Sequence, residues 1–289
     1  MTTNDLAEAA HRVDRGRIAL LTRHGKERAL APVLESVLGG IVQRIDDFDT
    51  DTLGSFTREI PRAGTQIEAA RKKARIGMTH AGLARGLGSE GAFGADPVTG
   101  LLPWNVEVVV LIDDVLDIEI VGMAQGAAMH AHREVGDWQA AAAFARDARF
   151  PGHHLVVRAD DQHDPCYEKG IDTWAALEAA FLRAQARSAR GRVFLESDLR
   201  AHANPTRMAL IGRAAGDLAA RYRSKCPRCS SPGFSVVERQ GGLPCSACDA
   251  PTREMHAEVF KCQKCTHTER RVRTDLTHAD PGRCDLCNP

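Results

Sequence analysis

The sequence CPRC at 226–229, followed by CSAC at 245–248, CQKC at 262–265 and CDLC at 284–287, decides the fold of the C-terminal part of the chain. In each Cys-x-x-Cys pair a tight turn can direct two thiolates at one ion, and two pairs complete a tetrahedral site of four sulfur ligands. Intervals of 15, 13 and 18 residues between the pairs leave room for short hairpins. The pattern therefore predicts a zinc ribbon at 225–289 with two structural zinc ions.

All eight cysteines of the ribbon are predicted zinc ligands. They are Cys226, Cys229, Cys245, Cys248, Cys262, Cys265, Cys284 and Cys287. Closed four-thiolate sites leave zinc no position for a water, so we expect no catalysis by these ions. Three pairings of the four units are open, with consecutive pairing modestly preferred over a nested one. Residues 234–238 are expected to form a hairpin that turns at Gly241 and Gly242 into Leu243.

Composition limits what the rest of the chain does. The 289 residues hold 38 basic and 38 acidic side chains, so any polyanion must be met by a local cluster of charge. No apolar run approaches the roughly 18 residues that span a bilayer, and the ninth cysteine, Cys166, stands alone, which argues against a secreted disulfide scaffold. We expect a cytoplasmic protein of two domains without membrane contact.

Before the ribbon, strand and helix patterns alternate, which predicts an α/β domain at 17–224 after a flexible segment at 1–16. The expected strands are 18–22, 87–89, 106–112, 118–124, 154–158 and 192–196. The expected helices are 27–38, 66–78, 138–146, 173–188 and 205–223. A turn is expected at Glu90 and Gly91. The fold class predicted is one mixed sheet flanked by helices, followed by the small cysteine-rich domain.

Three polar segments of this domain have the composition of a nucleotide site: 22–27, 48–73 and 89–91. A bound nucleoside triphosphate needs carboxylates for Mg²⁺ and cations or backbone donors for its phosphates. The segments supply both kinds of group, and the first lies between a strand and a helix N-terminus, where α/β proteins bind anions. Solvated surface residues are the simpler interpretation of each segment taken alone.

The order of these motifs resembles the superfamily of inosine triphosphate pyrophosphatases, noncanonical purine nucleoside triphosphatases and Maf-type septum inhibitors. Thr22-Arg-His-Gly-Lys26 is similar to the opening Thr/Ser-x-Asn-x-x-Lys loop, without its asparagine. Glu68-Ala-Ala-Arg-Lys-Lys73-Ala matches Glu-Asn-Ala-x-x-Lys-Ala with alanine for asparagine, and Leu87-Gly-Ser-Glu90-Gly-Ala looks like the acidic segment that follows. The whole chain also resembles an uncharacterised bacterial family in which such a domain is fused to these cysteines.

The resemblance implies Mg²⁺-dependent hydrolysis of a noncanonical nucleoside triphosphate to monophosphate and pyrophosphate, by an inosine triphosphatase-like fold that is commonly dimeric. Glu68 and Glu90 are the implied Mg²⁺ ligands and catalytic residues, with Glu90 favoured for orienting the attacking water. The predicted phosphate ligands are Thr22, His24, Lys26, Lys73, Arg200 and Arg207. An additional pocket is predicted at Asp49, Asp51, Asp198, His202 and Asn204, although Asn204-Pro205 is equally well explained as a helix cap.

Two alternatives to a hydrolase stay open. One is a non-catalytic protein that senses a nucleotide and contacts nucleic acid or protein through its ribbon. The other is an enzyme of the same fold with different phosphate or glycosyl chemistry. The ribbon carries Arg253, Lys261, Lys264, Arg270, Arg271 and Arg273, for which an ordinary solvated face is the simpler explanation than a nucleic-acid surface.

Overall fold

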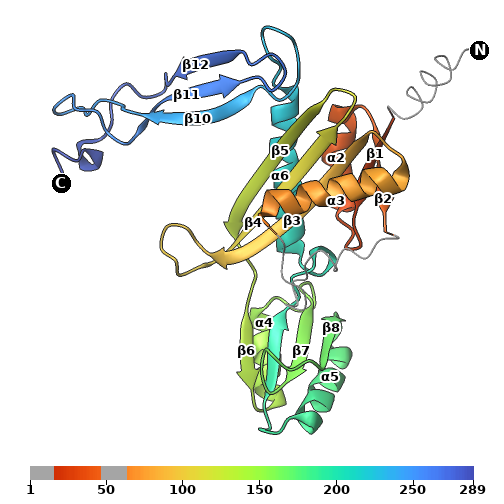
Figure 1. The fold of residues 1–289 in the computed structure, drawn as a ribbon. Helices are drawn as coiled ribbons and strands as arrows, with labels where there is room; N and C mark the ends of the chain where they lie inside the picture. Colours follow the sequence, from red (N-terminus) through yellow and green to blue (C-terminus); the bar gives the residue numbers. More distant parts are fainter. Residues whose placement is uncertain (1–15, 47–63) are drawn as a thin grey trace, which may run out of the picture. The chain divides into compact units, whose positions relative to one another are not determined.

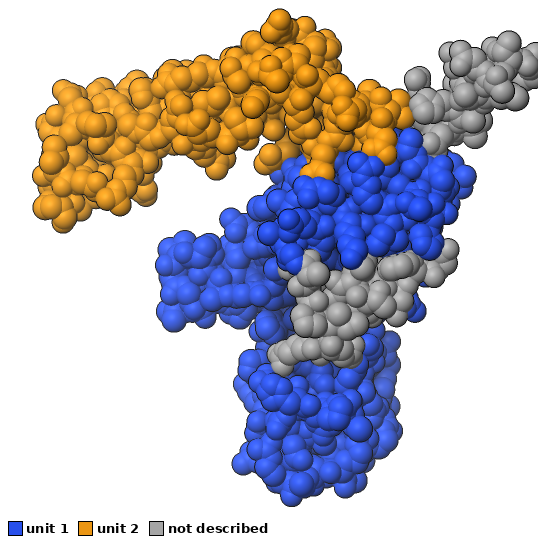
Figure 2. Space-filling model, in the orientation of Figure 1, with its two compact units in different colours: residues 1–112, 121–218 blue, residues 113–120, 219–289 orange. Residues whose placement is uncertain are grey.

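A computed structural model describes residues 16–46 and 64–289 of the chain. The expected flexible segment at 1–16 lies, except for Gly16, outside the described residues. The chain divides into two compact units, which Figure 2 colours separately. Unit 1 comprises 1–112 and 121–218, and unit 2 comprises 113–120 and 219–289. Among the described residues, no helix is long and apolar enough to cross a membrane.

The first sheet of unit 1 has five strands in the order β2-β1-β3-β4-β5 (Figure 1). Its strands are β1 (Arg17–Leu21), β2 (Ile41–Ile45), β3 (Arg85–Ala95), β4 (Pro103–Asp113) and β5 (Ile118–Ala127). β1 is parallel to both β2 and β3, and α2 (Glu27–Leu38) connects β1 with β2. β3, β4 and β5 are joined in sequence order by short connections, so one sheet combines a crossover half with a meander half.

Helix α3 (Gln66–Ala81) covers one face of this sheet (Figure 1). Its buried Ala70, Ala74 and Met78 pack on alternate residues of β4, among them Val108 and Val110. The approach is so close that a side chain at Gly88 of β3 would overlap the Ala70 carbonyl. Small residues on both elements therefore fix α3 against β3, which determines where the polar side chains of each can meet.

A second sheet of unit 1 has four antiparallel strands in the order β6-β9-β7-β8. These are β6 (His132–Val135), β7 (Leu155–Ala159), β8 (Tyr167–Ile171) and β9 (Val193–Ser197). Helices α4 (Trp138–Asp147) and α5 (Trp174–Arg187) share their core with this sheet, where Phe144, Leu155 and Phe181 are buried. A short helix η2 (Ala201–Ala203) and the long α6 (Pro205–Arg223) follow β9.

The α/β class and the mixed sheet are confirmed, but the prediction of one sheet was wrong. β6 and β8, with the sequences HREV and YEKGI, are short and largely polar, so their patterns did not indicate strands and the sheet they complete was missed. The turn expected at Glu90 and Gly91 was also wrong, because β3 runs through both residues to Ala95. The bounds expected for helices 27–38 and 205–223 are those of α2 and α6, and the other three expected helices differ from α3, α4 and α5 by at most three residues at either end.

Unit 2 contains a three-stranded antiparallel sheet in the order β10-β11-β12. The strands are β10 (Ser235–Gly241), β11 (Met255–Lys261) and β12 (Thr268–Val272), and η3 (Pro281–Arg283) precedes the last cysteine pair. The expected hairpin was wrong, because β10 pairs with β11 and not with the segment after Gly242. The turn between β4 and β5 belongs to this unit: Gln263 Nε2 donates to the Glu119 carbonyl at 2.6 Å, and Lys264 pairs with Asp117 at 3.1 Å.

Candidate functional site

The eight ribbon cysteines form two tetrads that alternate along the sequence. Cys226, Cys229, Cys262 and Cys265 make one, and Cys245, Cys248, Cys284 and Cys287 make the other. In each tetrad the four sulfur atoms lie within 4.8 Å of one another. The closest sulfur contacts are 3.6 Å in the first tetrad and 3.7 and 3.8 Å in the second. Tetrahedral Zn–S bonds of about 2.3 Å place sulfurs about 3.8 Å apart, so both tetrads are compatible with structural zinc.

Strand direction explains why the preferred consecutive pairing was wrong. The first cysteine pair precedes β10 and the second follows it, so these pairs lie at opposite ends of the sheet. Antiparallel β11 returns the chain to the first end, where the third pair follows, and β12 leads again to the far end and the fourth pair. Three antiparallel strands thus bring the first pair to the third and the second to the fourth.

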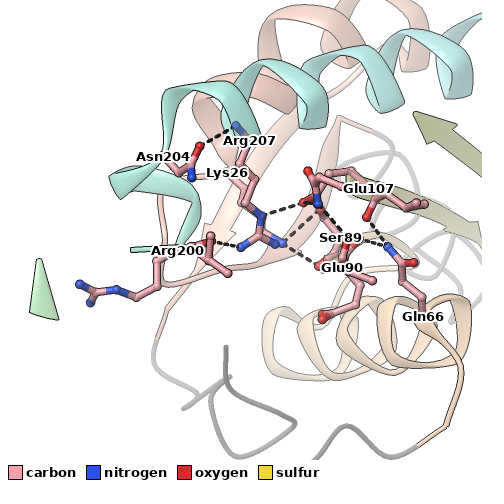
Figure 3. A network of polar contacts seen from close by, with 12 residues as sticks. Lys26, Gln66, Ser89, Glu90, Glu107, Arg200, Asn204 and Arg207 are labelled. Carbon is pink, nitrogen blue, oxygen red and sulfur yellow. Dashed lines mark hydrogen bonds and ion pairs between the residues drawn. The ribbon is translucent and has the colours of Figure 1, made fainter. Parts of the chain in front are cut away.

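The polar network of unit 1 lies where β3 and β4 meet α3 and α6 (Figure 3). Successive side chains of a strand point to opposite faces, so Glu90 meets α3 while its neighbour Gly91 faces α6. Lys73 Nζ of α3 lies 2.6 Å from Glu90 Oε2, and both side chains are largely buried. The amide of Gln66, at the start of α3, donates to the carbonyls of Glu90 and Val106 at 2.8 Å each and fastens the helix to both strands.

On the face toward α6, Arg207 and Glu107 form a fully buried ion pair. Arg207 Nε lies 2.7 Å from Glu107 Oε1, with the side chains 1% and 0% exposed. Gly91 makes room for this pair, because a Cβ there would overlap Glu107 Oε1 and lie 2.6 Å from Arg207 Nη2. The α6 N-terminus is fixed by Asn204, whose Oδ1 accepts from the Arg207 backbone N–H at 3.0 Å. The predicted cap interpretation of Asn204 is therefore confirmed.

Lys26 completes the cluster from the residue that precedes α2. Its Nζ donates to the carbonyl and the hydroxyl of Ser89, at 2.9 and 3.2 Å. Burial, followed by the nearby Arg207 guanidinium, lowers the pKa of Lys26 to about 7, although Glu107 acts in the opposite direction. A lysine with this pKa is partly protonated at neutral pH, and an anion placed beside it would favour the protonated form.

Glu68 lies apart from these contacts, at the exposed N-terminus of α3. Its Oε2 accepts from the backbone N–H and the hydroxyl of Thr65, at 2.7 and 2.9 Å, in a capping box. The Thr65 backbone N–H, and then its hydroxyl, lower the pKa of Glu68. The observed contacts thus give this carboxylate a helix-capping role, and its proposed role toward Mg²⁺ stays a prediction.

The other predicted residues of unit 1 form two groups, one around His24 and His202 and one around Asp198 and Arg200. Thr22 is buried and its Oγ1 accepts from the His24 backbone N–H at 3.3 Å. The His24 ring lies against that of His202, with centroids 5.3 Å apart and the ring planes tilted by 32°. Arg200 is held by the buried Asp198, whose Oδ1 lies 3.0 Å from Nε. Burial, and next the Arg200 charge, lower the pKa of His202.

Asp49 and Asp51 of the predicted additional pocket lie outside the described residues. The sequence analysis missed Glu107 and Asn105, and it included Ser89 only as a member of the polar segment 89–91. Glu107 carried a signal that was overlooked, since it is the single charged residue in the apolar stretch 106–112 of an expected buried strand. A charge in such a position requires a partner.

The fold and the two sites together define an α/β protein with a buried cluster of cations and carboxylates and a ribbon of two cysteine tetrads. The family model described as "Domain of unknown function (DUF6671)" matches residues 73–289, and the chain therefore belongs to the DUF6671 family. The match includes Lys73, Glu90, Glu107 and Arg207 as well as all eight ribbon cysteines. No curated protein and no solved structure matches the chain.

Proposed function

We propose that the chain binds a nucleoside triphosphate through its phosphates and hydrolyses it to a monophosphate and pyrophosphate, on a fold of the inosine triphosphatase type. The observation that carries this proposal is the convergence of three cations from separate elements, of which Lys26 and Arg207 are buried and Lys73 is largely buried. Lys73 of α3 pairs with Glu90 on β3, and Arg207 of α6 pairs with Glu107 on β4. Lys26, which precedes α2, donates to Ser89, the neighbour of Glu90 on β3. Buried charges cost stability unless paired, so a cluster of five suggests a functional requirement.

The cations can hold a polyphosphate in different ways. Arg207 presents a planar guanidinium suited to phosphate oxygens, whereas Lys26 and Lys73 act as point charges. The N-terminus of α2 adds the partial positive charge of its first backbone N–H groups. When a phosphate pairs with Lys73 in place of Glu90, the Glu90 carboxylate is released and can orient a water for attack on phosphorus. Mg²⁺, when bound with the nucleotide, neutralises charge that develops during the transfer.

The test is a screen for pyrophosphate and phosphate release from common and modified nucleoside triphosphates with Mg²⁺, using zinc-loaded protein. Glu90→Gln is the informative variant, and Glu178→Gln, at an exposed position of α5, is the matched control. We expect selective turnover that Glu90→Gln loses and Glu178→Gln retains. Turnover unaffected by Glu90→Gln would exclude the proposed role of this carboxylate.

A specific observation also favours a non-catalytic nucleotide-binding protein as the second candidate. Each of the three carboxylates already has a partner: Thr65 for Glu68, Lys73 for Glu90 and Arg207 for Glu107. A site of this kind can hold phosphates without activating water. Nucleotide binding in the presence of Mg²⁺ without any turnover would identify it, and the ribbon would then serve to contact protein or nucleic acid.

A further inference from the structure

Two oxygen atoms of the α6-facing side of β4 are buried without a hydrogen-bond donor among the described residues: Glu107 Oε2 and Asn105 Oδ1. Their residues are 0% and 2% exposed. Buried acceptors are almost always satisfied in folded proteins, because each one left unpaired keeps the cost of its lost hydration. Two on neighbouring side chains of one strand indicate a missing partner that supplies positive charge or donors.

The neighbouring groups determine which oxygen atoms of Asn105 and Glu107 lack a hydrogen-bond donor. Asn105 Nδ2 donates to the Ala92 carbonyl at 3.0 Å and to Glu107 Oε1 at 3.1 Å, and both of these neighbours are acceptors. The amide therefore cannot be reversed without placing oxygen against oxygen. Glu107 Oε1 also takes the Arg207 Nε–H, so Oε2 is the carboxylate oxygen left over. The two acceptors without a donor are therefore one carboxylate oxygen and one amide carbonyl oxygen.

We propose that Glu107 and Asn105 form a binding site for a divalent cation of the Mg²⁺ class. Carboxylate and amide oxygens are hard ligands, and Mg²⁺ commonly takes only one or two protein ligands and completes its shell with water and substrate phosphates. The carboxylates that the sequence favoured are committed elsewhere, Glu68 to the cap of α3 and Glu90 to Lys73. This assignment rests on the proposed function in one respect, since the phosphates that share the cation are those of its substrate.

The charges around the pair make a second, distinctive feature of the site. Lys73 and Arg207 balance Glu90 and Glu107, and Lys26 adds up to one further positive charge. A divalent cation alone would thus enter a region that is neutral to positive, whereas a polyphosphate would reverse the local sign. Cation and polyphosphate should therefore strengthen each other's binding, and by linkage the two effects are equal.

The experiment measures Mn²⁺, a paramagnetic substitute for Mg²⁺, by electron paramagnetic resonance on the zinc-loaded full chain, with and without inorganic tripolyphosphate. For the wild type we expect Mn²⁺ binding that tripolyphosphate strengthens. Glu107→Gln should weaken it by about tenfold or more, and the exposed Glu178→Gln should not. Bound Mn²⁺ should also broaden the Asn105 side-chain amide resonance in an NMR spectrum, assigned by its loss in Asn105→Ala. This last readout requires no Glu107 variant to fold.

Several outcomes would overturn the assignment. The assignment is refuted if Glu107→Gln leaves the Mn²⁺ affinity unchanged, if bound Mn²⁺ does not broaden the Asn105 amide resonance, or if Mn²⁺ does not bind with or without tripolyphosphate. In each of these cases the partner of the two oxygens would be an internal water. Failure of the proposed function looks different: tripolyphosphate would not strengthen Mn²⁺ binding and no nucleotide would be hydrolysed. If the protein hydrolyses a nucleotide but Glu107→Gln leaves its Mn²⁺ affinity unchanged, the proposed function holds and the proposed cation site is refuted.

Discussion

Replacing Lys26 by methionine should change how the stability of unit 1 depends on pH. Methionine keeps the length of the buried side chain and removes its charge. Lys26 is 7% exposed and its pKa falls from 10.5 to about 7 on folding. Between these two values the unfolded chain holds a proton that the folded chain lacks, so stability rises with pH by up to about 1.4 kcal/mol per unit.

The sign and size of the effect follow directly. Below pH 7 the lysine is protonated in both states and its burial cost is fully present; as the pH rises toward 10.5 that cost is relieved. From pH 7 to pH 9 the wild type should gain about 2 kcal/mol from Lys26 that Lys26→Met does not gain.

Urea unfolding followed by tryptophan fluorescence provides the assay, since Trp104, Trp138 and Trp174, the three tryptophans of the chain, all belong to unit 1. The quantity compared is the change in unfolding free energy between pH 7 and pH 9. Lys72→Met, at an exposed position of α3, is the matched control and should behave as the wild type. An equal pH dependence in the wild type and Lys26→Met would refute the buried, charge-depleted environment described for this lysine.

Three further predictions concern the tetrads and the cluster. Cys226→Ser combined with Cys262→Ser should leave one zinc ion per chain by elemental analysis, and Cys226→Ser combined with Cys245→Ser none; consecutive pairing predicts the reverse. Gly91→Ala should destabilise unit 1 in the same urea assay by about 1–3 kcal/mol, because its Cβ displaces the Glu107–Arg207 pair; a neutral effect would contradict the packing. Thr65→Ala should cost about 1 kcal/mol, since it removes the side-chain cap of α3; full stability would contradict the capping box.

The sequence indicated those parts of the fold whose signals are local. The helix at 27–38 ends at Gly39 in the left-handed conformation, and the helix from 66 begins at a Thr65–Glu68 capping box, so both limits are determined by nearby residues. The cysteine spacing likewise indicated two tetrads. Which pairs combine could not be read locally, because it depends on the direction of β11.

The candidate site was predictable only in part, for the same reason. Lys26, Lys73 and Glu90 were named from a motif order, and the structure brings Lys73 to Glu90. The partner of Arg207 is 100 residues away in sequence, at Glu107. No local pattern reveals such a pair, although a lone acid in an apolar strand does reveal that a partner is needed.

The central claim, that phosphates bind at Lys26, is tested most directly by calorimetric titration of a nucleoside triphosphate with Mg²⁺ at pH 8, repeated in two buffers of different ionisation enthalpy. With its pKa at about 7, Lys26 is mostly neutral at pH 8 before binding, and a phosphate beside it should draw in a proton. We expect uptake of nearly one proton per nucleotide by the wild type and of almost none by Lys26→Met. Binding without proton uptake, or equal uptake in both proteins, would contradict the claim.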